Sequence, residues 1–171
     1  IPIEIDFTRD GFEIPCIISP SENDQYQSYL AIISGAALAT IYERYGSRLL
    51  EQNVRSFLQF TGKINKGMRK TINEEPHMFL AFNNGIAVTA EEIEIAKSGD
   101  GKGYLISKVK DFQIVNGGQT TASIYHTFKK DKADISGVFV QVKLTVVKNR
   151  NDFSKIVSRI SEYANTQNKV S

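Results

Sequence analysis

Residues 112–125 read FQIVNGGQTTASIY, and this stretch contains the strongest functional signal of the chain, the polar loop over 116–121. An apolar run over 112–115 precedes two glycines, and apolar residues at helical spacing follow, so the stretch predicts a strand, a loop and a helix. Unpaired backbone N–H groups at a helix start attract anions, and glycines let a phosphate approach the backbone. The loop is therefore expected to hold phosphate. The residues expected to contact such a ligand are Asn116, Gly117, Gly118, Gln119, Thr120 and Thr121.

A structural explanation of the same loop stays open. A helix start can need glycine only for its turn and threonine only as a cap. Against this, two glycines followed by Gln119, Thr120 and Thr121 supply more hydrogen-bond donors than a cap requires. The loop is not a Walker motif, because the lysine of that motif is missing. Function is the favoured interpretation.

Periodicity outward from this stretch predicts an α/β (α+β) fold with a mixed β-sheet flanked by helices. Strands are predicted by alternation or by short apolar runs between turn residues, over 1–7, 12–18, 79–82, 86–89, 91–96, 104–109, 112–115 and 138–147. Helices are predicted where apolar residues recur at helical spacing, over 26–41, 64–72, 120–130 and 153–164. No linker divides the chain, so residues 1–171 are expected to form one domain, cut from a longer protein because the chain begins without Met.

Composition limits the class of protein. Of the 171 residues, 41% are hydrophobic and 23% are charged, which is ordinary for a globular domain. A net charge of +2 does not by itself indicate a nucleic-acid binder. The lone Cys16 excludes an internal disulfide, and neither a signal peptide nor a membrane span is evident, so a soluble cytoplasmic protein without membrane contact is expected. His77 and His126 have no partners at ligand spacing, so no metal site is predicted.

Three further polar segments are candidates, each with a structural alternative. Asn53 and Arg55 place an amide beside a guanidinium suited to gripping phosphate, although a solvated helix face is equally open. Arg69, with two neighbouring lysines, could neutralise phosphate or simply form the solvent-exposed face of a short helix. Asn83 and Asn84 precede Gly85 between two apolar runs, a typical hairpin turn. Polar residues after the last helix could add hydrogen bonds or only end it; they are Asn165, Gln167 and Asn168.

Five segments together resemble the AIPR family, prokaryotic proteins named for abortive phage-infection resistance. They occur in the family's order and read LLEQNVRSFL (49–58), INKGMRKTI (64–72), FLAFNNGI (79–86), IVNGGQTT (114–121) and ANTQNKV (164–170). The resemblance implies a domain of a phage-defence protein. It also implies that the positions of Asn53 and Arg55, of Asn83 and Asn84, and of residues 116–121 are motif sites, which weakens the hairpin explanation.

A more distant similarity links the loop to ParB/sulfiredoxin-like domains, which also run from a strand through a glycine-containing loop into a phosphate-holding helix. Their loop typically ends in arginine, and residues 116–121 contain none, although Arg55 or Arg69 could substitute from elsewhere. The similarity is treated as an analogy of fold.

Three functions follow from these observations. The leading hypothesis is binding of a phosphate-bearing ligand, either a nucleotide or nucleic acid, in a polar pocket around residues 116–121. The second is an enzyme hydrolysing nucleotides or nucleic acid in the same pocket, which would lack an acid/base pair because amides and hydroxyls are poor proton shuttles. The third is a protein-interaction scaffold for the remaining parts of a longer chain. Catalytic residues, cofactors and oligomeric state are not indicated.

Overall fold

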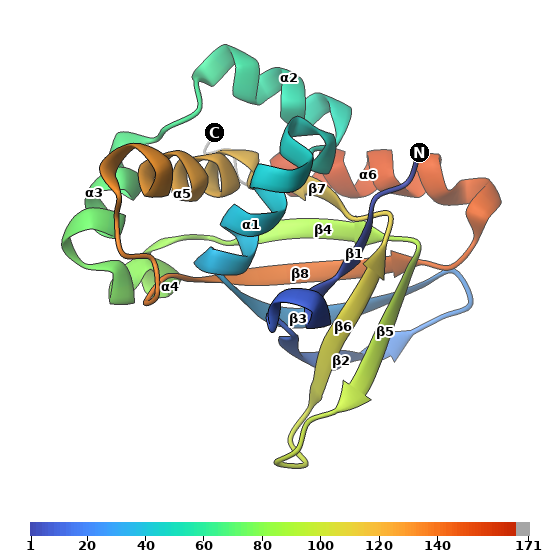
Figure 1. Cartoon of the computed structure of the whole chain (residues 1–171). Coiled ribbons are helices and arrows are strands. Elements are labelled where there is room, and N and C mark those ends of the chain that lie inside the picture. Colours follow the sequence, from blue (N-terminus) through green and yellow to red (C-terminus); the bar gives the residue numbers. More distant parts are fainter. Residues whose placement is uncertain (167–171) are drawn as a thin grey trace.

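In residues 1–166, which the computed structural model describes, eight strands form one mixed sheet flanked by helices (Figure 1). The strand order is β1–β6–β2–β3–β8–β4–β7, and β5 pairs with β6. The strands are β1 Glu4–Asp6, β2 Ile14–Glu22, β3 Tyr26–Ser34, β4 Ile86–Ala90, β5 Glu92–Lys97, β6 Tyr104–Lys110, β7 Gln113–Asn116 and β8 Phe139–Val147. The helices are α1 Gly35–Tyr45, α2 Gln52–Thr61, α3 Lys66–Glu74, α4 Phe79–Phe82, α5 Gly118–Asp131 and α6 Phe153–Thr166. The predicted α+β fold with a mixed sheet is confirmed.

The main core lies between the sheet and the helices α1 and α5. Strand β8 shows how the sequence builds it, because Val140, Val142 and Leu144 are buried while Gln141 and Lys143 between them are exposed. Such alternation places every second side chain on one face of a strand. The neighbouring strands β3 and β8 pair antiparallel along nine residues, and β8 pairs parallel with β4 on its other side.

Strand β4 is buried on both faces. Ile86 and Val88 join the main core, whereas Ala87 packs with Val115 and Val157 in a second, smaller core under α6. A strand covered on both faces is expected to be apolar throughout, as β4 is. The start of β4 lies beside the end of its antiparallel neighbour β7, with Ala87 opposite Asn116. The candidate site lies at this end of the two strands.

The predicted helix over 26–41 is wrong in its first half. Residues 26–34 form strand β3, and α1 begins only at Gly35, after the Ser34 Oγ accepts a hydrogen bond from the Ala37 N–H at 3.1 Å. Apolar residues recur at helical spacing there, but Ala31 and Ile33 are buried while Leu30 and Ile32 are exposed, as in a strand. Pairing with β2 and β8 on both edges outweighs the local preference.

The predicted strand over 79–82 is also wrong, because these residues form the one-turn helix α4. A four-residue apolar run does not distinguish a strand from a helix by periodicity. The segment Asn83-Asn84-Gly85 consequently connects α4 to β4 and is not a hairpin turn; β4 pairs with β7 and β8. Here the Asn83 Oδ1 accepts a hydrogen bond from the Gly85 N–H at 2.8 Å, which closes a local turn.

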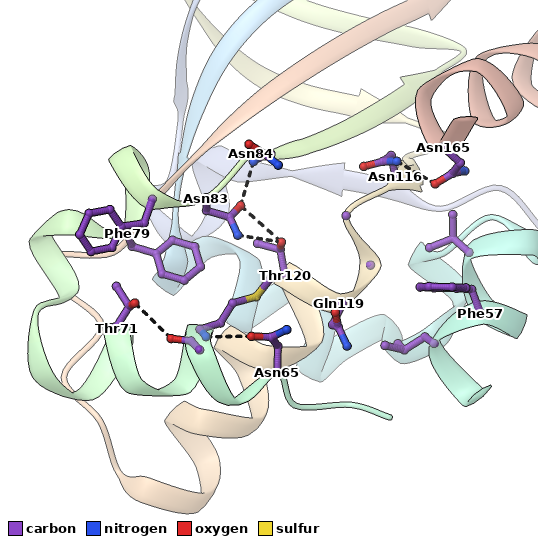
Figure 2. Close-up of a pocket in the computed structure, with 18 of the residues that line it drawn as sticks. Phe57, Asn65, Thr71, Phe79, Asn83, Asn84, Asn116, Gln119, Thr120 and Asn165 are labelled. Carbon is purple, nitrogen blue, oxygen red and sulfur yellow. Dashed lines mark hydrogen bonds between the residues drawn. The ribbon is translucent and has the colours of Figure 1, made fainter. Parts of the chain in front are cut away.

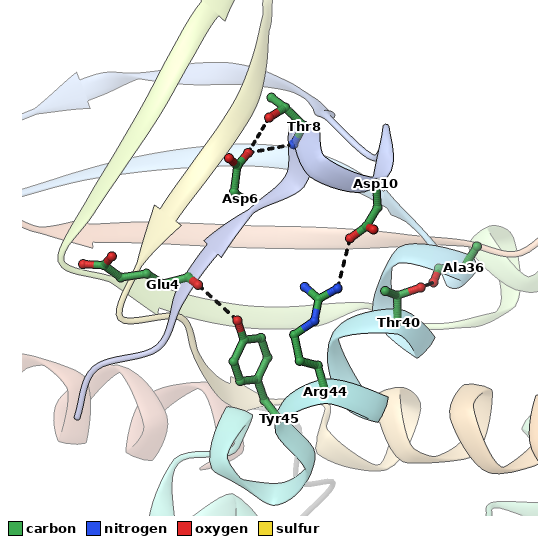
Figure 3. A network of polar contacts seen from close by, with 8 residues as sticks. All are labelled: Glu4, Asp6, Thr8, Asp10, Ala36, Thr40, Arg44 and Tyr45. Carbon is green, nitrogen blue, oxygen red and sulfur yellow. Dashed lines mark hydrogen bonds and ion pairs between the residues drawn. The ribbon is translucent and has the colours of Figure 1, made fainter.

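Polar contacts attach the N-terminal segment to α1 (Figure 3). The Arg44 guanidinium lies 3.3 Å from the Asp10 carboxylate, and the Tyr45 hydroxyl donates to the Glu4 carbonyl at 3.1 Å. Further into the core, burial raises the pKa of the Cys16 thiol to about 11. None of the helices in residues 1–166 is both long and apolar enough to cross a membrane.

Candidate functional site

A pocket of about 920 Å³ lies beside the start of β4 and the start of α5 (Figure 2). Its walls come from α2, α3 and α4 and from the two loops that contain Asn83 and Gly117. It combines amides, glycines, threonines and apolar side chains. The lining residues are Asn53, Val54, Phe57, Leu58, Asn65, Gly67, Met68, Thr71, Phe79, Phe82, Asn83, Asn84, Gly85, Asn116, Gly117, Gly118, Gln119, Thr120 and Asn165.

The pocket brings together segments that are distant in the sequence because strand pairing holds their ends side by side. Antiparallel pairing of β4 with β7 places the loop after α4 next to the loop before α5. A parallel bridge joins Leu50 to Ile114, and the Glu51 N–H donates to the Ile114 carbonyl at 2.9 Å. This contact starts α2 beside β7. The Glu51 carboxylate then caps α2 at the Asn53 N–H and accepts from the Ser161 hydroxyl of α6 at 3.1 Å.

The start of α5 opens toward this pocket. Gly117 is its N-cap residue, with φ of +89°, and no side chain caps the helix. Among the described residues, the N–H groups of Gly118, Gln119 and Thr120 have no hydrogen-bond partner, and all three residues line the pocket. Unpaired N–H groups and the helix dipole give such a helix start a positive partial charge. The predicted strand–loop–helix is present.

The two glycines have packing roles that the sequence did not indicate. A Cβ added to Gly117 would lie 2.6 Å from the Ile86 Cγ2 and 2.8 Å from the Gly85 carbonyl oxygen. A Cβ added to Gly118 would lie 2.6 Å from the Val54 Cγ1 of α2. Both glycines therefore let β4 and α2 approach the start of α5 closely. The close approach of a phosphate to this backbone stays a prediction.

Some pocket amides are held by internal hydrogen bonds. The Asn83 Nδ2 donates to the Thr120 Oγ1 at 3.2 Å, which ties the loop after α4 to α5. The Asn116 Nδ2 donates to the Asn165 Oδ1 at 2.7 Å, and the Asn165 Nδ2 donates to the Ser161 carbonyl at 2.6 Å. Figure 2 shows the contact of Asn83 with Thr120 and that of Asn116 with Asn165. These residues fix the geometry of the two loops.

Three other amide side chains of the pocket are not held by such hydrogen bonds within residues 1–166. The side chains of Asn53, Asn84 and Gln119 make no hydrogen bond to any described residue, and all three line the pocket. No ionisable side chain lines the pocket among residues 1–166. The site is therefore polar but uncharged, and its electrostatic character comes from helix ends and amide dipoles.

Several predicted site residues lie away from the pocket. The Arg55 guanidinium donates to the carbonyls of Ser47 at 3.1 Å and Leu50 at 3.0 Å, so it stabilises the turn that precedes α2. Thr121 is fully buried behind the pocket, and its hydroxyl has no partner among the described residues. Gln167 and Asn168 lie outside the described residues.

Arg69 also lies outside the pocket, where it joins α3 to α5. Its Nε donates to the Asp131 Oδ2 at 2.7 Å, and its Nη2 donates to Oδ1 at 2.5 Å. The Asn73 amide donates to the same carboxylate at 2.8 Å. These hydrogen bonds, the one from Arg69 foremost, hold the pKa of Asp131 below its ordinary value of 3.8.

We expect Asp131→Asn to reduce the pH dependence of stability in acid. The folded pKa of Asp131 is depressed, so its contribution to stability is complete above about pH 4 and is lost as the pH falls through the folded pKa. Urea unfolding at neutral pH should show a less stable variant, and the difference from the parent should shrink as the pH falls below about 4. Asp24→Asn, at an exposed carboxylate without a hydrogen bond, is the control. A constant difference at all pH values would contradict this role.

The pocket also contains residues that the sequence analysis did not select. Asn65 caps α3 through its Oδ1, which accepts from the Met68 N–H at 3.0 Å, and a capping signal could have identified it. Phe57, Phe79 and Phe82 form apolar walls, and no local pattern marks them as different from core residues. No group of three or more His, Cys, Asp or Glu residues lies together as for a metal ion in residues 1–166.

Fold and pocket define the class: an α+β domain with an uncharged, amide-lined pocket at the start of a helix. The family model described as AIPR protein matches residues 50–171, which is more than half of the chain. The chain therefore belongs to the AIPR family, which is associated with abortive-infection resistance to phage, as the five segments predicted. No curated protein and no solved structure matches the chain.

Proposed function

We propose that this phage-defence domain binds a phosphate-bearing ligand, a nucleotide or nucleic acid, in the amide-lined pocket. The observation that carries the proposal is the open start of α5, where three N–H groups without a partner in residues 1–166 meet a cavity that no acidic side chain of this range lines. A phosphate placed there accepts hydrogen bonds from the backbone and interacts favourably with the helix dipole.

A second helix start supports this location. Asn65, the N-cap of α3, lines the same pocket with Gly67 and Met68 of its first turn. Two helices of nine and fourteen residues thus begin at one cavity. Their partial charges add where both starts face the same anion.

Neutral donors would have to hold the phosphate, because the two arginines that were expected to neutralise it have other partners. Arg55 binds backbone carbonyls and Arg69 binds Asp131. Phosphate would therefore be held by the N–H groups of Gly118, Gln119 and Thr120 at the start of α5. Within residues 1–166 no cationic side chain lines the pocket, so only the helix starts offset the charge of the ligand.

The test is the thermal stability of the chain with nucleotides and short DNA and RNA, with and without Mg²⁺. A ligand that binds the native state raises the melting temperature by mass action, equivalent to about 2.7 kcal/mol at a hundred times its Kd. We expect Gln119→Ala to weaken the shift several-fold, because one amide to the ligand is lost. Gln52→Ala, at the exposed start of α2 outside the pocket, is the matched control and should keep the full shift.

If no ligand in the panel raises the melting temperature, the proposal is wrong and the protein-interaction scaffold replaces it. One observation favours that second candidate. A groove of about 770 Å³ between α6 and the sheet is largely apolar and is lined by exposed Ile17, Leu30 and Tyr163. Exposed apolar surface of this kind marks binding faces. A hydrolysing enzyme has no comparable support, because no acid/base side chain lines the pocket among the described residues.

A further inference from the structure

The uncommitted amides come from three different walls of the pocket. Asn53 lies in the first turn of α2, Asn84 in the loop before β4, and Gln119 in the first turn of α5. Each has a donor and an acceptor side by side and makes no side-chain hydrogen bond to a described residue. Figure 2 shows Gln119 and Asn84 on separate parts of the wall. These three amides can therefore form hydrogen bonds with a ligand that presents donors and acceptors next to each other.

Aromatic side chains with exposed surface face the same cavity. Phe57 on α2 is 63% exposed and Phe82 at the end of α4 is 58% exposed, although both line the pocket. Phe79, which also lines the pocket, is fully buried in the core. Exposed phenylalanines in a polar cavity leave apolar surface in water, and a flat apolar ligand group would cover it. Stacking of a base on an aromatic ring is the common solution in single-strand recognition.

A nucleobase satisfies both observations. Its edge presents a donor beside an acceptor, which a primary amide can match with two hydrogen bonds, as Asn and Gln do with adenine. Its face can stack on phenylalanine. Inorganic phosphate or a sugar phosphate would leave both the phenylalanine faces and most of the amides unused.

The absence of ionisable side chains from the pocket lining in residues 1–166 limits the number of phosphates. A helix start carries only about half an elementary charge. It offsets roughly a quarter to a third of the charge of a phosphate monoester, which is about −1.5 to −2 near pH 7, and a still smaller share of the charge of a triphosphate. A base that carries a single phosphate therefore fits the pocket better than a nucleoside triphosphate does.

We propose that the pocket recognises an unpaired nucleobase carrying a single phosphate, with the base edge on the free amides of Asn53, Asn84 and Gln119 and the base face on Phe57 or Phe82. This inference rests on the proposed function, which places the phosphate at α5. The same chemistry is offered by a free nucleoside monophosphate and by the unpaired end of a nucleic-acid strand. Stacking inside a duplex covers the base faces that the phenylalanines need, so an unpaired base is the expected ligand.

The test is calorimetric titration of the 171-residue chain with AMP, GMP, CMP and UMP, each compared with ribose 5-phosphate, inorganic phosphate and ATP. At least one monophosphate should bind tenfold or more tightly than ribose 5-phosphate. Phe57→Ala should weaken that nucleotide roughly five- to hundredfold and leave ribose 5-phosphate unchanged. Phe60→Ala, on the same helix but 90% exposed and outside the pocket, is the matched control and should bind like the parent.

Each outcome separates this inference from the proposed function. Equal binding of ribose 5-phosphate and all four nucleotides, unaffected by Phe57→Ala, would overturn base recognition while phosphate binding stands. ATP binding more tightly than every monophosphate would overturn the single-phosphate inference. If none of the probes binds, the proposed function fails as well. A 5′-phosphorylated single-stranded oligonucleotide that binds more tightly than its terminal monophosphate identifies a strand end as the source; the reverse identifies the free nucleotide.

Discussion

Gly85→Ala is expected to lower the free energy of unfolding by at least about 3 kcal/mol, because backbone strain and a steric clash add at this position. Gly85 has φ of +85°, which L side chains rarely adopt. An added Cβ would overlap the carbonyl oxygen of Gln141 and lie 3.1 Å from the carbonyl carbon of the same residue. That carbonyl belongs to the central strand β8, so it cannot move without disturbing the β4–β8 pairing. A typical domain has only about 5–15 kcal/mol of stability.

Urea unfolding of Gly85→Ala beside Gly99→Ala measures the effect. Gly99 lies in the β5–β6 hairpin loop, where an added Cβ meets no atom within 4 Å, so its change should stay within about 0.5 kcal/mol. The Gly85 variant should also lose nucleotide binding in proportion to its unfolding, since Gly85 lines the pocket. Equal stability of the two variants would contradict the close approach of Gly85 to the Gln141 carbonyl.

Gln119→Glu is expected to change stability and ligand binding in opposite directions. A carboxylate in the first turn of α5 interacts favourably with the helix dipole, which should raise the free energy of unfolding by about 0.3–1 kcal/mol. The same carboxylate would repel a bound phosphate. At about 6 Å and an effective dielectric constant of about 20 the repulsion is roughly 2–3 kcal/mol, or about a hundredfold in Kd. Gln119→Glu would therefore separate the effect on the free energy of unfolding from the effect on ligand binding.

The control is Gln52→Glu, at the exposed start of α2. It adds the same charge at a helix start outside the pocket, so it should show the small gain in stability with no loss of binding. Thermal unfolding gives the first quantity and titration with nucleotide gives the second. If Gln119→Glu binds nucleotide as tightly as the parent, the phosphate does not lie at the start of α5, and the proposed function must be revised.

Local sequence patterns predicted the parts of the fold in which alternation or turn residues alone indicate the secondary structure. The alternation of Val140, Val142 and Leu144 predicted β8, and the glycines after Val115 predicted the change from β7 to α5. These patterns are short-range properties of the chain, and strand and helix periods differ enough to be told apart over nine or more residues. The family resemblance added the prediction that the motif segments matter, and residues from all five segments line the pocket, namely from 49–58, 64–72, 79–86, 114–121 and 164–170.

The errors lie where tertiary pairing overrides a local preference. Residues 26–34 carry a helical spacing, yet partners on both edges make them a strand, because two ladders of backbone hydrogen bonds and a buried face outweigh propensity. The strand predicted over residues 79–82 is wrong for a different reason: the apolar run is too short for its period to distinguish a strand from a helix, and the residues form α4. The asparagines that follow were assigned to a hairpin, but β4 finds its partners elsewhere in the chain.

The sequence by itself determined the α+β class, the family, and the strand–loop–helix whose unpaired N–H groups anchor the candidate site. Only the tertiary structure decided which polar side chains are available to a ligand. Arg55 and Arg69 looked like phosphate ligands, but each has partners that become neighbours through folding. The side chains of Asn53, Asn84 and Gln119, by contrast, find no hydrogen-bond partner within residues 1–166. A hydrogen bond depends on distance and direction in space, and a linear pattern carries neither of these for residues that lie far apart in the chain.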